Sequence, residues 1–99
     1  MEAEAAPVRK ELNLTGEGNP LAEGISARLW SNESVHVVIN GSDSRFGVDA
    51  IGTLPASLTT LLAIKKTNPK IVISAGTCGG FTARDGFIGE IILANRCVF

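Results

Sequence analysis

The glycine-rich run Ala75–Gly80, with the sequence AGTCGG, is the segment best suited to hold a ligand. It directly follows Lys70–Ser74, an apolar stretch that predicts a buried strand. Its three glycines would let the backbone approach a ligand closely. A tight strand exit with nothing bound would have the same composition, so the pattern alone leaves both interpretations open. The run matches neither a GxGxxG dinucleotide motif nor a P-loop.

Glu4 is the second candidate for chemistry. A carboxylate between a strand and a helix could act as a general base or hold a water molecule. A glutamate at a helix start is also favoured by the helix dipole alone, and the sequence by itself favours that simpler interpretation.

Three further side chains could take part in chemistry, but for each of them the sequence favours an ordinary structural role. His36 lies within a predicted strand, where a packed or surface histidine is the usual finding. Cys78 lies in the glycine run with no base close to it in sequence, which favours a small buried residue over a nucleophile. Arg45, in a polar loop, could meet an anion, although solvated arginines are the common case.

The elements that must position these residues can be predicted along the chain. Met1–Leu14 predicts a helix that properly starts near Ala5 or Ala6, because Pro7 is tolerated only in a first turn. Glu4 would then precede the helix. Thr15–Gly24 predicts a loop.

Two predicted strands, 25–30 and 35–40, form a hairpin around the polar turn 31–34. After the polar loop that begins at Gly41, Val48–Thr67 predicts a helix with a kink or a late start at Pro55. Five residues are predicted to form its buried face: Ile51, Leu54, Leu58, Leu61 and Leu62.

Lys70–Ser74 is predicted to be a central strand with a strand on each side, and Ile88–Val98 to be the last strand. A helix followed by a buried strand indicates an α/β sheet with helices on its faces. Ligands of such sheets bind beyond the carboxyl ends of the strands, which is where Ala75–Gly80 would lie.

Composition excludes several classes of protein. The 99 residues are enough for at most one small domain, and 44% are hydrophobic, an ordinary globular balance. A net charge of -1 and the lack of a basic stripe argue against a nucleic-acid or membrane-surface partner. Only two cysteines and one histidine are present, so we expect reduced thiols, no metal site and a cytoplasmic location.

Three segments together carry a family resemblance. Gly47–Phe81, with the sequence GVDAIGTLPASLTTLLAIKKTNPKIVISAGTCGGF, closely resembles the plant-type 5'-methylthioadenosine/S-adenosylhomocysteine nucleosidases of the purine nucleoside phosphorylase superfamily. Ile88–Ile92 resembles the family's following strand. Met1–Ala5 more weakly resembles its A-M-x-x-E-A signature. The resemblance therefore covers nearly the whole chain.

The resemblance implies an α/β fold, namely part of an incomplete α/β/α sandwich with a mixed central sheet, in which residues 1–99 are the N-terminal portion of one domain. It implies hydrolysis of an N-glycosidic bond that releases adenine, as in methionine salvage, with no cofactor and usually a homodimer. Glu4 would bind the attacking water. The nucleoside would be contacted by two groups of residues: Thr77, Cys78 and Gly79, and Arg45, Phe46 and Gly47.

The sequence also departs from the family pattern. The family's first buried strand would precede Met1, and its catalytic aspartate and ribose-binding Met-Glu pair would follow Phe99. We therefore expect a fragment or truncated gene product that is inactive alone, with Met1 an internal methionine. Two alternatives stay open: a phosphorylase, which needs arginines for phosphate, and a non-catalytic nucleoside-binding or storage relative.

Overall fold

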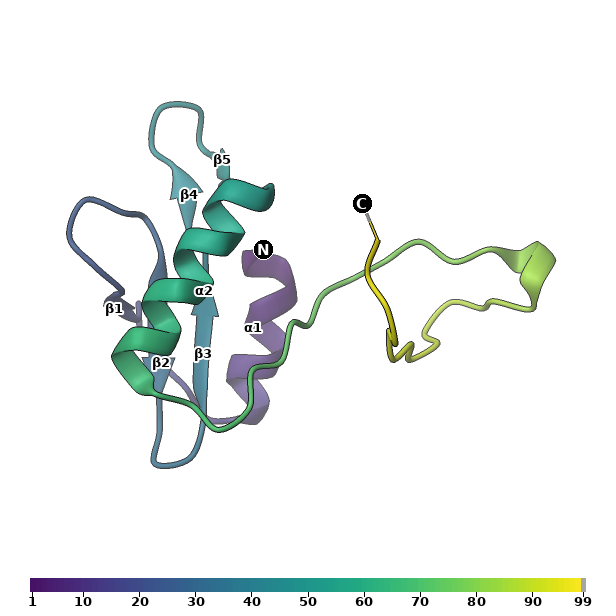
Figure 1. Ribbon diagram of the computed structural model, residues 1–99, viewed down its shortest axis with the longest axis horizontal. Helices are drawn as coiled ribbons and strands as arrows, with labels where there is room; N and C mark the ends of the chain where they lie inside the picture. Colours follow the sequence, from purple (N-terminus) through teal and green to yellow (C-terminus); the bar gives the residue numbers. More distant parts are fainter. Residues whose placement is uncertain (99) are drawn as a thin grey trace.

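The structure of the protein is a computed structural model that describes residues 1–98. It contains a helix, three strands of one sheet, a small hairpin, a second helix and a single 3-10 turn (Figure 1). In chain order these are α1 (Glu2–Glu11), β1 (Asn19–Pro20), β2 (Arg28–Ser31), β3 (His36–Ile39), β4 (Ser42–Asp43), β5 (Val48–Asp49), α2 (Thr53–Thr67) and η1 (Thr82–Arg84).

Helix α1 starts earlier than predicted. The Met1 carbonyl accepts hydrogen bonds from the amides of Glu4 and Ala5, so Glu4 lies inside the first turn and not before it. The helix runs through Pro7 and ends at Glu11, three residues before the predicted end. The expectation that Pro7 would delay the helix was wrong, because α1 packs against β3 and Trp30, and such tertiary contacts stabilise a helix despite the hydrogen bond that a proline removes.

The predicted hairpin is confirmed with shorter strands. β2 and β3 pair antiparallel, with Leu29 opposite Val38 and Ser31 opposite His36. The Asn32 side chain closes the turn by accepting hydrogen bonds from the amides of Ser34 and Val35. Part of the predicted loop 15–24 adds β1 to this sheet, paired with β2.

Successive side chains of β2 point to opposite faces of the sheet, and each face is covered by a different helix. Leu29 lies in the buried cluster with Leu21 and Ala27, against which Leu62 and Ala63 of α2 pack. The next side chain, Trp30, points to the opposite face of the sheet.

On that face the Arg9 guanidinium of α1 lies 4.1 Å from the centre of the Trp30 ring. Trp30 Nε1 donates to the Gly16 carbonyl at 3.0 Å. Gly18 leaves room for the indole, since a Cβ there would lie 2.5 Å from Trp30 Cε2. The sheet is therefore held between α1 and α2.

The late start of α2 is confirmed, but its predicted buried face is wrong. Val48–Asp49 is a strand, and the helix begins at Thr53, with Pro55 in its first turn. The side that meets the sheet carries Thr59, Leu62 and Ala63. Four residues of the predicted buried face are exposed: Ile51, Leu54, Leu58 and Leu61. The reason is that leucines occur on two sides of this helix, and only the side of Leu62 contacts the sheet.

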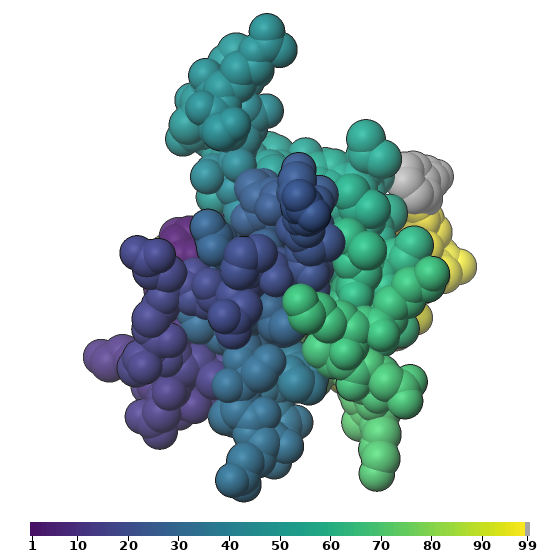
Figure 2. All heavy atoms as spheres, turned by 90° about the vertical axis from the view of Figure 1, so that its left-hand side faces the viewer, coloured from purple at the N-terminus to yellow at the C-terminus, as the bar shows by residue number. Residues whose placement is uncertain are grey.

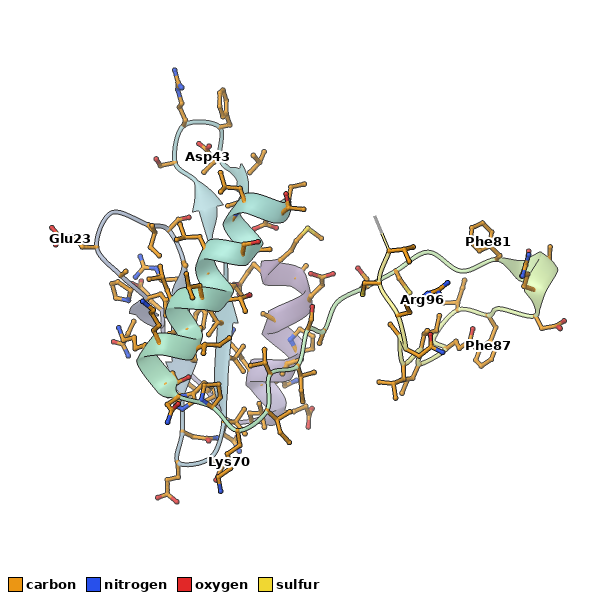
Figure 3. All side chains as sticks on the ribbon, viewed as in Figure 1. Glu23, Asp43, Lys70, Phe81, Phe87 and Arg96 are labelled. Carbon is orange, nitrogen blue, oxygen red and sulfur yellow. The ribbon has the colours of Figure 1, made fainter. Side chains whose placement is uncertain are left out.

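The two strands predicted after α2 are absent from the described residues. Lys70–Ser74 and Ile88–Val98 form an extended tail that runs past α1, turns at η1 and folds back (Figure 1). Figure 3 places Phe81 and Phe87 on this excursion, away from both helices. Ile71 and Ile73 are 77% and 81% exposed. A strand requires a neighbouring backbone, and no described segment pairs with either stretch, so the prediction of a central strand with two neighbours is wrong here.

Candidate active site

Glu4 lies at the N-terminus of α1, where its carboxylate folds back over the start of the helix. Its Oε2 accepts a hydrogen bond from the Met1 N-terminal ammonium at 2.6 Å. This contact is one half of a capping box, in which the third helical residue reaches back to the residue before the helix. The position also suits a negative charge, because the first amides of a helix carry partial positive charge.

Thr77 of the glycine run meets the same carboxylate. Both the Thr77 amide and the Thr77 hydroxyl donate to Glu4 Oε1, each at 2.8 Å. Gly76 allows this approach, since a Cβ there would lie 3.2 Å from Glu4 Oε1. The fold thus brings together two predicted site residues that lie 73 positions apart. Among residues 1–98, these two hydrogen bonds join the tail after Asn68 to the rest of the protein.

These donors keep the carboxylate charged. The Met1 ammonium, then the amide and then the hydroxyl of Thr77, lower the pKa of Glu4 to about 2. Each favours the charged form by donating a hydrogen bond to it. Glu4 is therefore ionised at neutral pH, and it acts as a hydrogen-bond acceptor.

The remaining predicted residues of the glycine run are open to solvent. Cys78 is an exposed free thiol, so the expectation of a small buried residue was wrong for the described structure. A Cβ added at Gly79 would meet no atom within 4 Å. Among the described residues, Thr77 donates hydrogen bonds to Glu4, whereas Cys78 and Gly79 donate none to it.

The second predicted group, Arg45, Phe46 and Gly47, lies at the tip of the β4–β5 hairpin, which projects from the body of the protein (Figure 2). The Asp43 carboxylate accepts hydrogen bonds from the amides of Arg45 and Phe46, which closes the turn. The Arg45 guanidinium lies 5.6 Å from the Phe46 ring centre. The structure does not bring this tip to Glu4.

The base of the hairpin, in contrast, does border the start of α1. A small cleft there has eight lining residues: Met1, Glu2, Ile39, Asn40, Gly41, Asp49, Ala50 and Ile51. Asn40 holds its two sides together, since its side-chain amide donates to the Ala50 carbonyl at 2.9 Å. Sequence reasoning missed Asn40, although a polar residue at the carboxyl end of a strand was a usable signal.

The other sequence candidates take no part in this arrangement. His36 hydrogen-bonds the Ser31 hydroxyl across the hairpin at 2.7 Å, as a surface histidine would. In the part of the chain that the structure describes, no group of three or more His, Cys, Asp or Glu side chains is placed to hold a metal ion.

Neither described helix has the length and apolar character that a membrane span needs.

The lone pairs of Glu4 limit what the site can do. A carboxylate offers about two acceptor positions on each oxygen. Thr77 fills both positions on Oε1, and the Met1 ammonium fills one on Oε2. One acceptor position on Oε2 is therefore left for a further donor such as a water molecule. An ionised carboxylate with one free position can orient a water and stabilise a nearby positive charge.

Comparisons with known proteins agree with this reading of the fold. The chain is 38% identical to a 5'-methylthioadenosine nucleosidase and 33% identical to a 5'-methylthioadenosine/S-adenosylhomocysteine nucleosidase, both of Arabidopsis thaliana. It is 30% identical to the corresponding nucleosidase of Aeromonas salmonicida. Each match covers the whole chain but only 39%, 41% and 39% of the relative, so the chain spans about two fifths of their length.

A solved structure, that of the Arabidopsis thaliana 5'-methylthioadenosine nucleosidase in apo form, superposes with a TM-score of 0.80 at 38% identity. The match covers 91% of this chain and 39% of the other. Because residues 1–67 are about two thirds of the chain, the superposition must include most of the tail. The chain has the predicted α/β architecture in incomplete form.

The resemblance to plant-type nucleosidases noted from the glycine run is thus confirmed by sequence and by structure. The family comparison is broader and covers every residue, since residues 1–99 match the Phosphorylase superfamily. With this match over its whole length, the chain belongs to the Phosphorylase superfamily.

Proposed function

We propose that the protein containing these residues is a nucleosidase that hydrolyses the N-glycosidic bond of 5'-methylthioadenosine or S-adenosylhomocysteine and releases adenine. The observation that supports the proposal is the pair of hydrogen bonds from Thr77 to Glu4. These bonds bring the glycine run into contact with the N-terminal segment that resembles the A-M-x-x-E-A signature. The names of the relatives supply the substrate class.

Glu4 would hold the attacking water. When the bond between the sugar C1' and the purine nitrogen breaks, its electron pair leaves with the purine, which takes up a proton, and the sugar becomes oxocarbenium-like. The water oxygen then bonds to C1' and loses a proton. A water that attacks a cation becomes strongly acidic, so a carboxylate with a low pKa is a sufficient acceptor. The fixed negative charge of Glu4 also stabilises the positive sugar.

Thr77, Cys78 and Gly79 are proposed to contact the nucleoside, since they continue from the Glu4 contact. Arg45, Phe46 and Gly47 are proposed to border the pocket from the neighbouring hairpin. The cleft at the hairpin base, next to Met1 and Glu2, supports a role for this hairpin near the site.

Several wider properties follow from the same assignment. We propose that residues 1–99 are the N-terminal portion of one nucleoside phosphorylase-like domain, and that its reaction serves methionine salvage in the cytoplasm without a cofactor. The two free thiols, Cys78 and Cys97, are consistent with a reducing compartment. A homodimer is supported by the exposed leucines on the outer side of α2.

The test is Glu4→Gln in the complete gene product. The amide oxygen can keep both Thr77 hydrogen bonds, while the amide nitrogen removes the charge and the free acceptor position. We expect kcat for adenine release to fall at least about 100-fold with KM nearly unchanged, since the lost interaction acts mainly in the transition state.

Glu11→Gln is the matched control, because it removes a carboxylate from the exposed far end of the same helix. Near-normal turnover of the Glu4 variant would remove the water-holding residue from the mechanism. Sugar phosphate as product would instead identify a phosphorylase. Tight nucleoside binding without any adenine release by the unmodified protein would identify a non-catalytic binding or storage relative.

A further inference from the structure

Glu4 Oε1 receives two hydrogen bonds from a single residue. The Thr77 amide fixes where the carboxylate lies, since a main-chain donor cannot rotate away. The Thr77 hydroxyl adds a second donor at the same distance of 2.8 Å. Both positions on Oε1 are thereby used, so this oxygen is held by Thr77 and not by solvent.

The sequence around Thr77 is adapted to this contact. At Gly76 any side chain would press on Glu4, because its Cβ would lie 3.2 Å from Oε1. At Gly79, by comparison, a Cβ would meet open space. The glycine run therefore has one glycine that serves the carboxylate and one that does not.

We propose that Thr77 is a positioning residue for Glu4, whose two donors occupy Oε1 and leave Oε2 as the oxygen that holds the attacking water. This goes beyond a role for Thr77 as a nucleoside contact. The mechanistic part rests on the proposed function, whereas the positioning part stands on the two hydrogen bonds alone. Because the Thr77 hydroxyl proton is used on Glu4, its oxygen can only accept from a ligand, which favours a sugar hydroxyl as its partner.

The charged groups around Glu4 are few, so the effect of Thr77 can be isolated. The Met1 ammonium is the charged partner, on Oε2. The other charges of α1 near this face, Glu2 and Arg9, pair with each other. Thr77 is uncharged, and replacing it changes only hydrogen bonding to Oε1. Samples that are compared with one another must have the same amino terminus, so that a difference between them reports on Thr77.

The first measurement is the pKa of Glu4, followed through its carboxyl carbon by NMR in the complete gene product. The two hydrogen bonds from Thr77 favour the charged carboxylate and lower this pKa. Thr77→Val keeps the branched shape but removes the hydroxyl, and we expect the pKa to rise toward its ordinary value. Thr77→Ser restores the hydroxyl and should restore the low pKa. An unchanged pKa in Thr77→Val would refute the positioning role.

The second measurement is the kinetics of adenine release in the complete gene product. Thr77→Val should lower kcat by about 10-fold or more with little change in KM, and shift the acidic limb of the pH profile upward, because misplacement of a reacting group slows catalysis steeply. Thr77→Ser should stay within about threefold of the native rate. A raised KM with unchanged kcat would mean that Thr77 only binds substrate, and would overturn the proposal.

A second pair of variants guards against misfolding of the first. Gly76→Ala should displace the carboxylate and raise the pKa of Glu4 as Thr77→Val does, whereas Gly79→Ala should leave that pKa as it is in the native protein. Equal effects of the two glycine variants would count against the proposal. If the Glu4 pKa responds as expected but no protein releases adenine, the positioning role stands and the proposed function fails.

Discussion

Gly41 connects β3 to the β4–β5 hairpin at a point where the backbone is crowded. Its φ is +76°, and a Cβ there would lie 2.0 Å from the Ser26 carbonyl oxygen and 2.5 Å from the Ser26 carbonyl carbon. Real Cβ contacts under 3.0 Å essentially never occur, so the two segments would have to separate by about 1 Å. Hydrogen bonds from Ser26 Oγ to the Asn40 carbonyl and from the Ala50 amide to the Gly41 carbonyl, both 2.9 Å, resist that movement.

The magnitude follows from two contributions. A left-handed alanine costs about 1–2 kcal/mol, of which about 0.4–1 kcal/mol is offset by the stiffer unfolded chain. Forcing the backbone apart adds about 1–3 kcal/mol. We therefore expect Gly41→Ala to lower the free energy of unfolding by about 2–4 kcal/mol.

Gly47→Ala is the matched control, with φ +66° and nothing within 4 Å of the added Cβ. This variant should lose only the conformational contribution, about 1 kcal/mol or less of the free energy of unfolding. Urea unfolding followed by the fluorescence of Trp30, the one tryptophan and 5% exposed, measures both variants. If Gly41→Ala destabilises the protein no more than Gly47→Ala does, the crowding at Ser26 is not a constraint on the fold and the reasoning fails.

Two further predictions concern helix α2. Lys66 Nζ donates to the carbonyls of Pro20 and Leu21 at 3.3 and 3.1 Å, so Lys66→Ala should lower the free energy of unfolding by about 1 kcal/mol in urea titrations, and Lys65→Ala by much less. Equal losses would mean that general charge, and not this contact, matters. For the proposed homodimer, Leu61→Lys on the exposed apolar side should shift the complete gene product toward monomer in sedimentation velocity, while Thr60→Lys, beside that side, should not. A dimer unaffected by Leu61→Lys would place the interface elsewhere.

Local sequence determined the elements whose stabilising contacts are near in the chain. The β2–β3 hairpin forms because its polar turn contains Asn32, whose side chain closes it. The end of α2 follows from Asn68, which takes the left-handed conformation as a cap, with φ 45°. The late start of α2, at Thr53 with Pro55 in its first turn, follows from the limits that proline places on a helix. These features require no knowledge of distant residues.

The glycine run and the segments around it also indicated the family to which the chain belongs. That resemblance identified Glu4 and Thr77 as separate site residues, each by its own motif. Nothing in their spacing indicated that they touch each other, because 73 residues and a whole sheet lie between them.

Tertiary structure decided what depends on partners. Which side of α2 is buried could not be read from its leucines, since two sides are apolar and only the sheet selects between them. α1 runs through Pro7 because it packs against β3 and Trp30, and these contacts come from residues distant in the sequence. Lys70–Ser74 has strand composition but no strand, because sheet hydrogen bonds belong to pairs of segments and not to one. Composition predicts that a segment can form a strand, but only the folded chain supplies the neighbouring strand with which it pairs.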